Sequence, residues 1–189
     1  MPEIEQAKRR EDTCQGEPPR LFAWLASGVT VALIFLSQFL PRSDNPYLRG
    51  VGVSGLLLAG VFIFWPFYLL ARHGGKSAPT YMQASVVVDR GLYAVVRHPQ
   101  YLGYILLACG FALLSQHTVS VLLTIIAAVL FYAQAVQEEG ACLAKFGDPY
   151  AQYCRRVPRF NVILGLFRHA VHPQGRSHRG RNGRRRSDS

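Results

Sequence analysis

The sequence is short of charge, and the charge that it has is unevenly distributed. Only 17% of its 189 residues are charged, against about 25% in an average globular protein. Residues 21–40 and 51–71 contain no charged residue at all. Charged residues are spread along the sequence of an average soluble domain, so these two stretches argue against a protein of that class. The length fits a single domain with a tail.

The sequence also lacks cysteine patterns that bind metals or form a disulfide framework. Its cysteines are Cys14, Cys109, Cys142 and Cys154. They form no CxxC pair, and two of them lie in or beside apolar segments, where a free cysteine acts as a small hydrophobic residue. No small-residue cleavage site stands out after the first apolar run. We therefore expect no metal site, no disulfide framework and no signal peptide.

Apolar runs are what the sequence has in abundance. Residues 21–40 and 51–71 are each long enough to cross the hydrocarbon core, which takes about 20 helical residues. Residues 101–115 and 119–136 form two further runs, separated by a short polar turn at 116–118. We interpret this pair as a helical hairpin of two spans, with a re-entrant hairpin or buried soluble helices as alternatives. The expected fold class is all-α, a polytopic membrane protein with about four transmembrane helices.

Composition divides the chain into four parts. Residues 1–20 are a polar N-terminal segment, and residues 21–77 contain the first two spans. Residues 78–165 form a core with the helical hairpin, and residues 166–189 are a basic tail that we expect to be disordered. Seven arginines and one aspartate in residues 168–189 give the tail six of the ten net positive charges.

The basic residues predict the orientation of the chain. They gather in the N-terminal segment, in the loop 72–100 and after residue 144, while the 116–118 turn has none. By the positive-inside rule, both termini and the long loop are cytoplasmic, in a bacterial inner membrane or an endomembrane. The tail then meets anionic lipid headgroups, or serves only as a topology signal. We expect no specific nucleic-acid partner, because four apolar runs disfavour a soluble nucleic-acid-binding protein.

Two polar clusters are expected on the cytoplasmic side. The first runs from Gly91 to Gly103 and reads GLYAVVRHPQYLG. Pro99 favours a helix start there, and the unpaired N–H groups of a helix N-terminus suit an anion. The second cluster contains Glu138 and Glu139, followed by FGDPY and VPRF. Two acids at a helix C-terminus near lipid need a partner. We expect one of them to be functional; an interfacial anchor is the alternative for the first cluster.

The ordered combination RHPQYLG, EE, FGDPY and VPRF resembles the isoprenylcysteine carboxyl methyltransferase family, within the phospholipid methyltransferase-like membrane enzymes. The resemblance covers about residues 78–162. It implies that S-adenosyl-L-methionine binds on the cytoplasmic face. The cofactor-binding residues that it implies are Val86, Val87, Val88, Tyr93, His98, Pro99, Gln100, Tyr101, Glu138 and Glu139.

The implied reaction is an in-line transfer of a methyl group, with His98 and Glu138 as catalytic candidates and Arg97 and Gln134 as substrate candidates. The resemblance leads us to expect an arginine four residues before Glu138, where this sequence has Gln134. The glutamine side chain is uncharged, so it cannot form an ion pair with a carboxylate. The acceptor is lipophilic or small, with a prenylcysteine-like carboxylate favoured by the resemblance. A phospholipid amine or a thiol, and a non-catalytic membrane protein of the same fold, are the alternatives.

Overall fold

The computed structural model describes residues 20–40, 45–73 and 87–171 of the chain. Every regular element in these ranges is a helix, which confirms the predicted all-α class. The elements are α2 (Leu21–Phe39), α3 (Pro46–His73), the short 3-10 helix η2 (Gly91–Ala94), α4 (Pro99–Ser115), α5 (Thr118–Phe146), α6 (Asp148–Arg156) and α7 (Val162–Val171).

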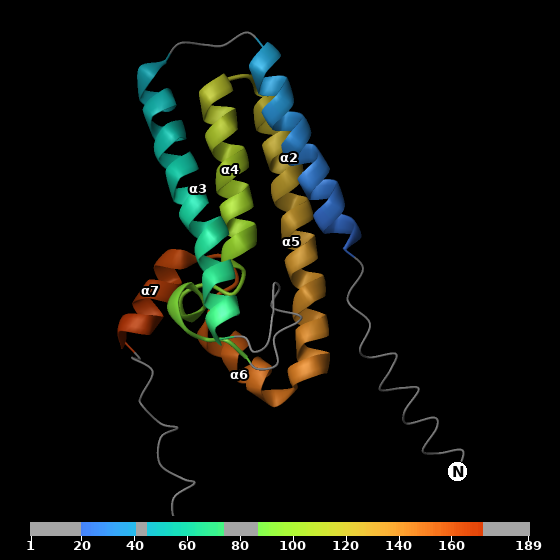
Figure 1. Cartoon of the computed structure of the whole chain (residues 1–189), viewed down its shortest axis with the longest axis vertical. Coiled ribbons are helices and arrows are strands. Elements are labelled where there is room, and N and C mark those ends of the chain that lie inside the picture. The colour runs from blue at the N-terminus through green and yellow to red at the C-terminus, as the bar shows by residue number, and fades with distance from the viewer. Residues whose placement is uncertain (1–19, 41–44, 74–86, 172–189) are drawn as a thin grey trace, which may run out of the picture.

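Four long helices form a bundle that carries the smaller elements at one end. Figure 1 shows α2, α3, α4 and α5 running along the long axis, with α6 and α7 at the lower end of the bundle. Helix α4 packs against α3, α5 and α2, and α2 packs against α5. Because α4 and α5 are joined by a two-residue connection, they are antiparallel neighbours, as the predicted hairpin requires.

The helices α2, α3 and α5 are long and apolar enough to cross a membrane, whereas α4 has 17 residues and is shorter. Large apolar side chains on these helices face outward, among them Trp24, Phe35, Phe64 and Val129. An apolar outer surface of this kind is suited to lipid. The structure therefore has the architecture of a polytopic membrane protein.

Close helix contact in the bundle depends on small residues. A Cβ atom at Gly103 of α4 would lie 3.0 Å from backbone atoms of α3, and a Cβ at Gly52 of α3 would lie 3.1 Å from the carbonyl oxygen of Gly110. Small residues allow backbones to approach in this way inside membranes, where packing rather than the hydrophobic effect drives helix association.

Two boundaries differ from the sequence-based prediction. Helix α5 continues ten residues past the predicted end of the fourth span and reaches Phe146, so both glutamates lie within the helix. Helix α7 covers residues 166–171, which the sequence analysis assigned to the disordered tail. The segment 1–19 and the tail from residue 172 lie outside the described residues, as does Val86.

Candidate functional site

The site lies at the end of the bundle where α4 begins and α5 ends. His98 is the N-cap of α4, and Pro99 occupies the first helical position, where its missing N–H is not needed. The backbone N–H groups of Arg97 and His98 donate to the carbonyl oxygens of Pro158 and Arg159, at 3.0 and 3.4 Å. These bonds bring the two polar clusters of the sequence together across about 60 residues of chain.

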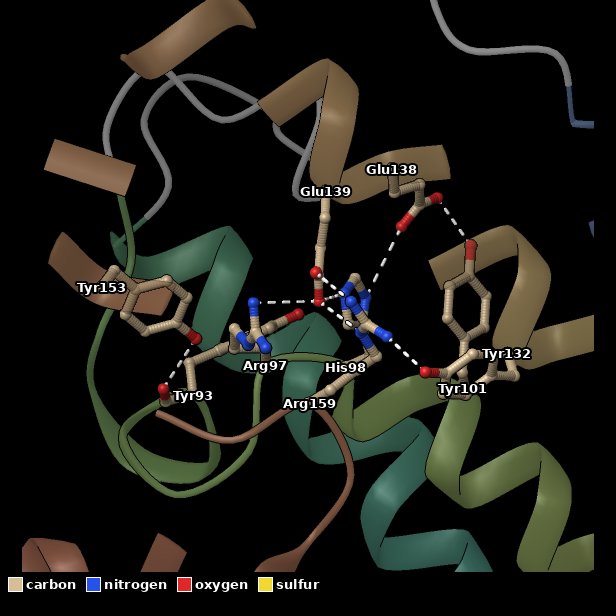
Figure 2. Close-up of polar contacts among 9 residues, drawn as sticks. All are labelled: Tyr93, Arg97, His98, Tyr101, Tyr132, Glu138, Glu139, Tyr153 and Arg159. Carbon is tan, nitrogen blue, oxygen red and sulfur yellow. Dashed lines mark hydrogen bonds and ion pairs between the residues drawn. The ribbon is translucent and has the colours of Figure 1, made fainter. Parts of the chain in front are cut away.

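Glu139 is the buried centre of an ionic network, as Figure 2 shows. It accepts hydrogen bonds from Nε and Nη2 of Arg159, at 2.8 and 2.6 Å. Nη1 of Arg97 lies 3.1 Å from the same carboxylate, and Nε2 of His98 lies 3.2 Å from it. A buried carboxylate is tolerated only when it is paired, so Glu139 holds the segments together rather than facing a ligand.

Arg159 has a second partner besides Glu139. Its Nη1 donates to the hydroxyl of Tyr132 at 2.7 Å, and its guanidinium carbon lies 5.0 Å from the centre of the Tyr132 ring. The hydrogen bond to Glu139 raises the pKa of Arg159 further above its already high ordinary value. Arg159 therefore remains charged and fixed in place.

Glu138, one residue before Glu139, has a different environment. Successive helical residues point about 100° apart, so the two side chains face different directions. The hydroxyl of Tyr101 donates to Oε1 of Glu138 at 2.6 Å, and Nδ1 of His98 lies 3.8 Å from Oε2. Glu138 is also more exposed than Glu139, with side-chain exposures of 21% and 9%. Of the two acids, Glu138 is the one available to a ligand.

His98 lies between the two carboxylates, and its ring stacks on Tyr101 at 5.7 Å between ring centres. An ionised carboxylate only accepts hydrogen bonds, so the contact with Glu139 assigns a proton to Nε2. In the neutral ring, Nδ1 is then the acceptor, on the side of Glu138. The arrangement fixes which nitrogen faces each carboxylate.

A cavity with about 680 Å³ of empty space, part of it open to solvent, lies beside Glu138. Seven of the residues singled out from the sequence line it, namely Tyr93, Arg97, His98, Pro99, Gln100, Tyr101 and Glu138. Within the described residues, Nε of Arg97 is buried without a hydrogen-bond partner, which leaves a donor for a ligand at the cavity wall.

Other residues singled out from the sequence lie behind the cavity wall. Val88 packs with Tyr93 against α3, and Val87 packs on the cluster around Tyr150 and Tyr153. Gln134 is completely buried, and its Oε1 accepts a hydrogen bond from the backbone N–H of Ala23 at 3.1 Å. These side chains, like that of Glu139, support the site and do not line it.

Four lining residues were not assigned a role by the sequence analysis, although one of them, Tyr150, lies in the FGDPY segment of its second cluster. Arg20 and Ala23 come from the start of α2, Cys142 from α5 and Tyr150 from α6. Arg20 is the last residue before the first apolar run, and this position was its available signal. Burial raises the pKa of Tyr93, and so does the nearby Glu138, so this phenol stays protonated. The hydroxyl of Tyr153 supports Tyr93 by donating to its carbonyl oxygen at 2.8 Å.

The family model and one curated relative carry the name of the same family. Residues 76–145 match the model of the isoprenylcysteine carboxyl methyltransferase (ICMT) family. The Protein-S-isoprenylcysteine O-methyltransferase of Schizosaccharomyces pombe is 40% identical over 74 residues, which are 39% of this chain and 31% of that protein. The family match covers the part of the chain that contains the start of α4 and both glutamates.

More distant relatives have other names. The cobalt-zinc-cadmium resistance protein CzcN of Cupriavidus metallidurans is 27% identical over 125 residues, which are 66% of this chain and 53% of CzcN. The Delta(14)-sterol reductase TM7SF2 of Mus musculus is 30% identical over 96 residues, which are 50% of this chain and 22% of the mouse protein. No solved structure matches significantly.

The chain thus spans about a third of the yeast methyltransferase and about half of CzcN. The region that matches carries the RHPQYLG segment and the two glutamates, and it folds into the hairpin that bounds the cavity. Over residues 76–145 the chain is therefore similar to the isoprenylcysteine carboxyl methyltransferase family, and the described residues have a helical membrane architecture.

Proposed function

We propose that this chain is a membrane methyltransferase that binds S-adenosyl-L-methionine in the cavity beside Glu138. The observation that carries the proposal is the position of the cavity, which is lined by side chains from the region that matches the methyltransferase family. In this proposal residues 78–165 are the catalytic core, and the end of the bundle with the cavity faces the cytoplasm with both termini.

The cavity wall suits a cationic ligand with polar ends. The Glu138 carboxylate is the negative group on the wall, and the rings of Tyr93, Tyr101 and Tyr150 surround the space. Carboxylates attract cations, and aromatic faces do the same through the ring quadrupole. The unpaired Nε of Arg97 and the start of α4 offer N–H donors to a carboxylate. The bound cofactor supplies an activated methyl group.

The residues assigned to the chemistry follow from these contacts. Glu138 holds the positive part of the cofactor, and His98 holds it from the start of α4. For an amine or thiol acceptor, Nδ1 of His98 takes the proton that the acceptor must lose. The Glu139 carboxylate beside Nε2 stabilises the imidazolium that results. A carboxylate acceptor is already ionised and needs no base.

The favoured acceptor remains a prenylcysteine-like carboxylate. Gln134 is buried and gives no charge to the cavity, but Arg20 at the start of α2 lines it. We assign Arg20 the pairing with the acceptor carboxylate, in place of a cation on α5. The phospholipid amine and the thiol remain the second choice, because they use His98 and not Arg20.

Binding of the cofactor tests the proposal directly. The full-length protein in lipid nanodiscs is titrated with S-adenosyl-L-methionine by calorimetry, alongside Glu138→Gln and the matched control Asp148→Asn, an exposed acid of α6. We expect saturable binding that weakens about tenfold or more in Glu138→Gln, since a charge-assisted contact is lost, and that is unchanged in Asp148→Asn. Absence of saturable binding, or equal effects of the two substitutions, refutes the proposal.

The relatives that are named as sterol reductases define a second arm of this experiment. The same protein is titrated with NADPH, because a reductase needs a hydride donor and a methyltransferase does not. Saturable binding of NADPH without binding of S-adenosyl-L-methionine would overturn the methyltransferase assignment. Binding of S-adenosyl-L-methionine without transfer of a labelled methyl group to membrane lipids or to a farnesylcysteine analogue favours the non-catalytic alternative.

A further inference from the structure

Helix α7 exposes the side that a helix normally buries. Its apolar side chains Ile163 and Phe167 are 82% and 66% exposed, and Leu166 is also exposed. At 100° per residue these three positions share one side of the helix with Ala170. The residue that faces the protein on the opposite side is Gly165, which is buried.

The orientation of α7 is fixed by a close backbone contact. A Cβ atom at Gly165 would overlap the carbonyl oxygen of Val95, so only glycine permits this approach. Asn161 caps the helix by accepting a hydrogen bond from the N–H of Leu164 at 2.9 Å. Arg168 donates to the carbonyl oxygen of Arg155 at 3.3 Å. The helix is therefore docked through its glycine side, with its apolar side facing outward.

Helix α7 is too short to cross a membrane. Ten residues extend roughly 15 Å, about half of the hydrocarbon core. Figure 1 shows α7 at the same end of the bundle as the last turns of α3, which carry the exposed Trp65 and Tyr68. Tryptophan and tyrosine are typical of the membrane–water interface. Arg155 and Arg168 are exposed at this end of the protein, and anionic headgroups at the surface of a bilayer complement such cations.

We propose that α7 is an interfacial helix that lies in the surface of the bilayer, with Ile163, Leu166 and Phe167 at the acyl-chain boundary and Arg168 among anionic headgroups. The apolar side of α7 then adds to the lipid-facing surface at this end of the bundle. This inference does not rest on the methyltransferase assignment, since it concerns the surface of the protein and not the cavity.

Binding of α7 to the bilayer also affects the geometry of the candidate functional site. The helix begins directly after Phe160 and Asn161, and the ring of Phe160 lies 6.0 Å from that of His98. Arg159, which holds Glu139, is three residues before the first residue of α7. A bilayer that fixes α7 thereby fixes the segment 158–160 against Arg97 and His98.

Site-specific fluorescence in lipid vesicles tests the inference. A fluorescent amino acid is introduced genetically at Ile163, or at His169 as the matched control on another side of the same helix. Both residues are exposed, so the fold tolerates the change, and circular dichroism checks it. The full-length protein is reconstituted, and quenching by doxyl-labelled phosphatidylcholine is compared with quenching by aqueous iodide.

We expect lipid quenching to be about threefold or more stronger at position 163 than at position 169, and iodide quenching to show the reverse order. Equal lipid quenching at the two positions overturns the inference. Protection of position 163 from both quenchers, with a photo-crosslink from the same position to a second copy of the chain, also overturns it, because a protein then covers α7.

A second pair of measurements tests the role of charge. Vesicles of phosphatidylcholine alone are compared with vesicles that also contain phosphatidylglycerol, in the native chain and in Arg168→Gln. We expect phosphatidylglycerol to increase lipid quenching at position 163 about twofold in the native chain, and less in Arg168→Gln. An increase of the same size in both proteins refutes the part of the inference that assigns Arg168 to anionic headgroups.

Discussion

Arg159 makes two hydrogen bonds to Glu139, from Nε at 2.8 Å and from Nη2 at 2.6 Å. This bidentate pair joins the segment after α6 to α5, and Arg97 and His98 contact the same carboxylate from the start of α4. One buried acid thus connects the three segments that form the base of the bundle. Its neighbour Glu138 is left to face the cavity.

Replacing Glu139 is expected to destabilise the protein more than replacing Glu138. Glu139→Gln removes the charge that both guanidinium groups share, and loss of one member of a buried ion pair costs about 3–5 kcal/mol. Glu138→Gln leaves that network intact and lowers stability by less than about 1 kcal/mol. Thermal unfolding in detergent measures the difference, and equal midpoints for the two variants would contradict the division of roles.

Tyr101→Phe is expected to weaken cofactor binding without loss of fold. The change removes the 2.6 Å hydrogen bond that orients Glu138, and bonds to charged groups contribute about 1.5–3 kcal/mol, which corresponds to roughly tenfold or more in affinity. Tyr104→Phe is the matched control, because Tyr104 stacks on Phe131 and does not line the cavity. Calorimetric titration with S-adenosyl-L-methionine distinguishes them; similar affinities would show that Tyr101 does not position Glu138.

Arg20→Gln is expected to act on the acceptor and not on the cofactor. Loss of the charge raises the KM for a farnesylcysteine carboxylate about tenfold, while the affinity for S-adenosyl-L-methionine changes little. An amine acceptor such as phosphatidylethanolamine gains no benefit from Arg20, so its KM stays the same. Methyl-transfer assays with both acceptors measure this, and a uniform loss with each of them would place Arg20 in cofactor binding instead.

Gly103→Ala and Gly55→Ala are expected to differ although both add one methyl group to a membrane helix. At Gly103 the new atom would lie 2.8 Å from Ile63 and 3.0 Å from the α3 backbone, whereas no atom lies within 4 Å at Gly55. Forcing a methyl group into packed helices costs about 1–3 kcal/mol. Thermal unfolding in lipid nanodiscs compares the variants; a stable Gly103→Ala would show that α3 and α4 separate easily.

Much of the site follows from local sequence, because its residues lie close together along the chain. Arg97 to Tyr101 form the start of one helix, and Pro99 fixes that start. Glu138 and Glu139 are consecutive residues of helix α5, so their side chains point about 100° apart and meet different partners. The roles of Val87, Val88 and Gln134 do not follow from such local signals, because their burial depends on residues from other helices.

The packing of helix α7 and the position of Arg20 at the cavity likewise could not be predicted from local sequence signals. The sequence of α7 is short and borders a basic segment, and its packing depends on one glycine that meets the backbone at Val95. Arg20 is one of many basic residues near a span, and only the packing of α2 on α5 brings it to the cavity. Contacts of this kind join residues more than 60 positions apart and leave no periodic pattern.

The sequence by itself determined the all-helical membrane architecture and the likeness of residues 76–145 to a methyltransferase family, because long uncharged runs and ordered polar motifs are local properties of the chain. The tertiary structure decided which polar residues hold the segments together and which line the cavity. Which glutamate is buried and which faces the cavity depends on how Arg97, His98 and Arg159 converge on α5. Convergence of distant segments is set by packing in three dimensions, and no single segment of the sequence encodes it.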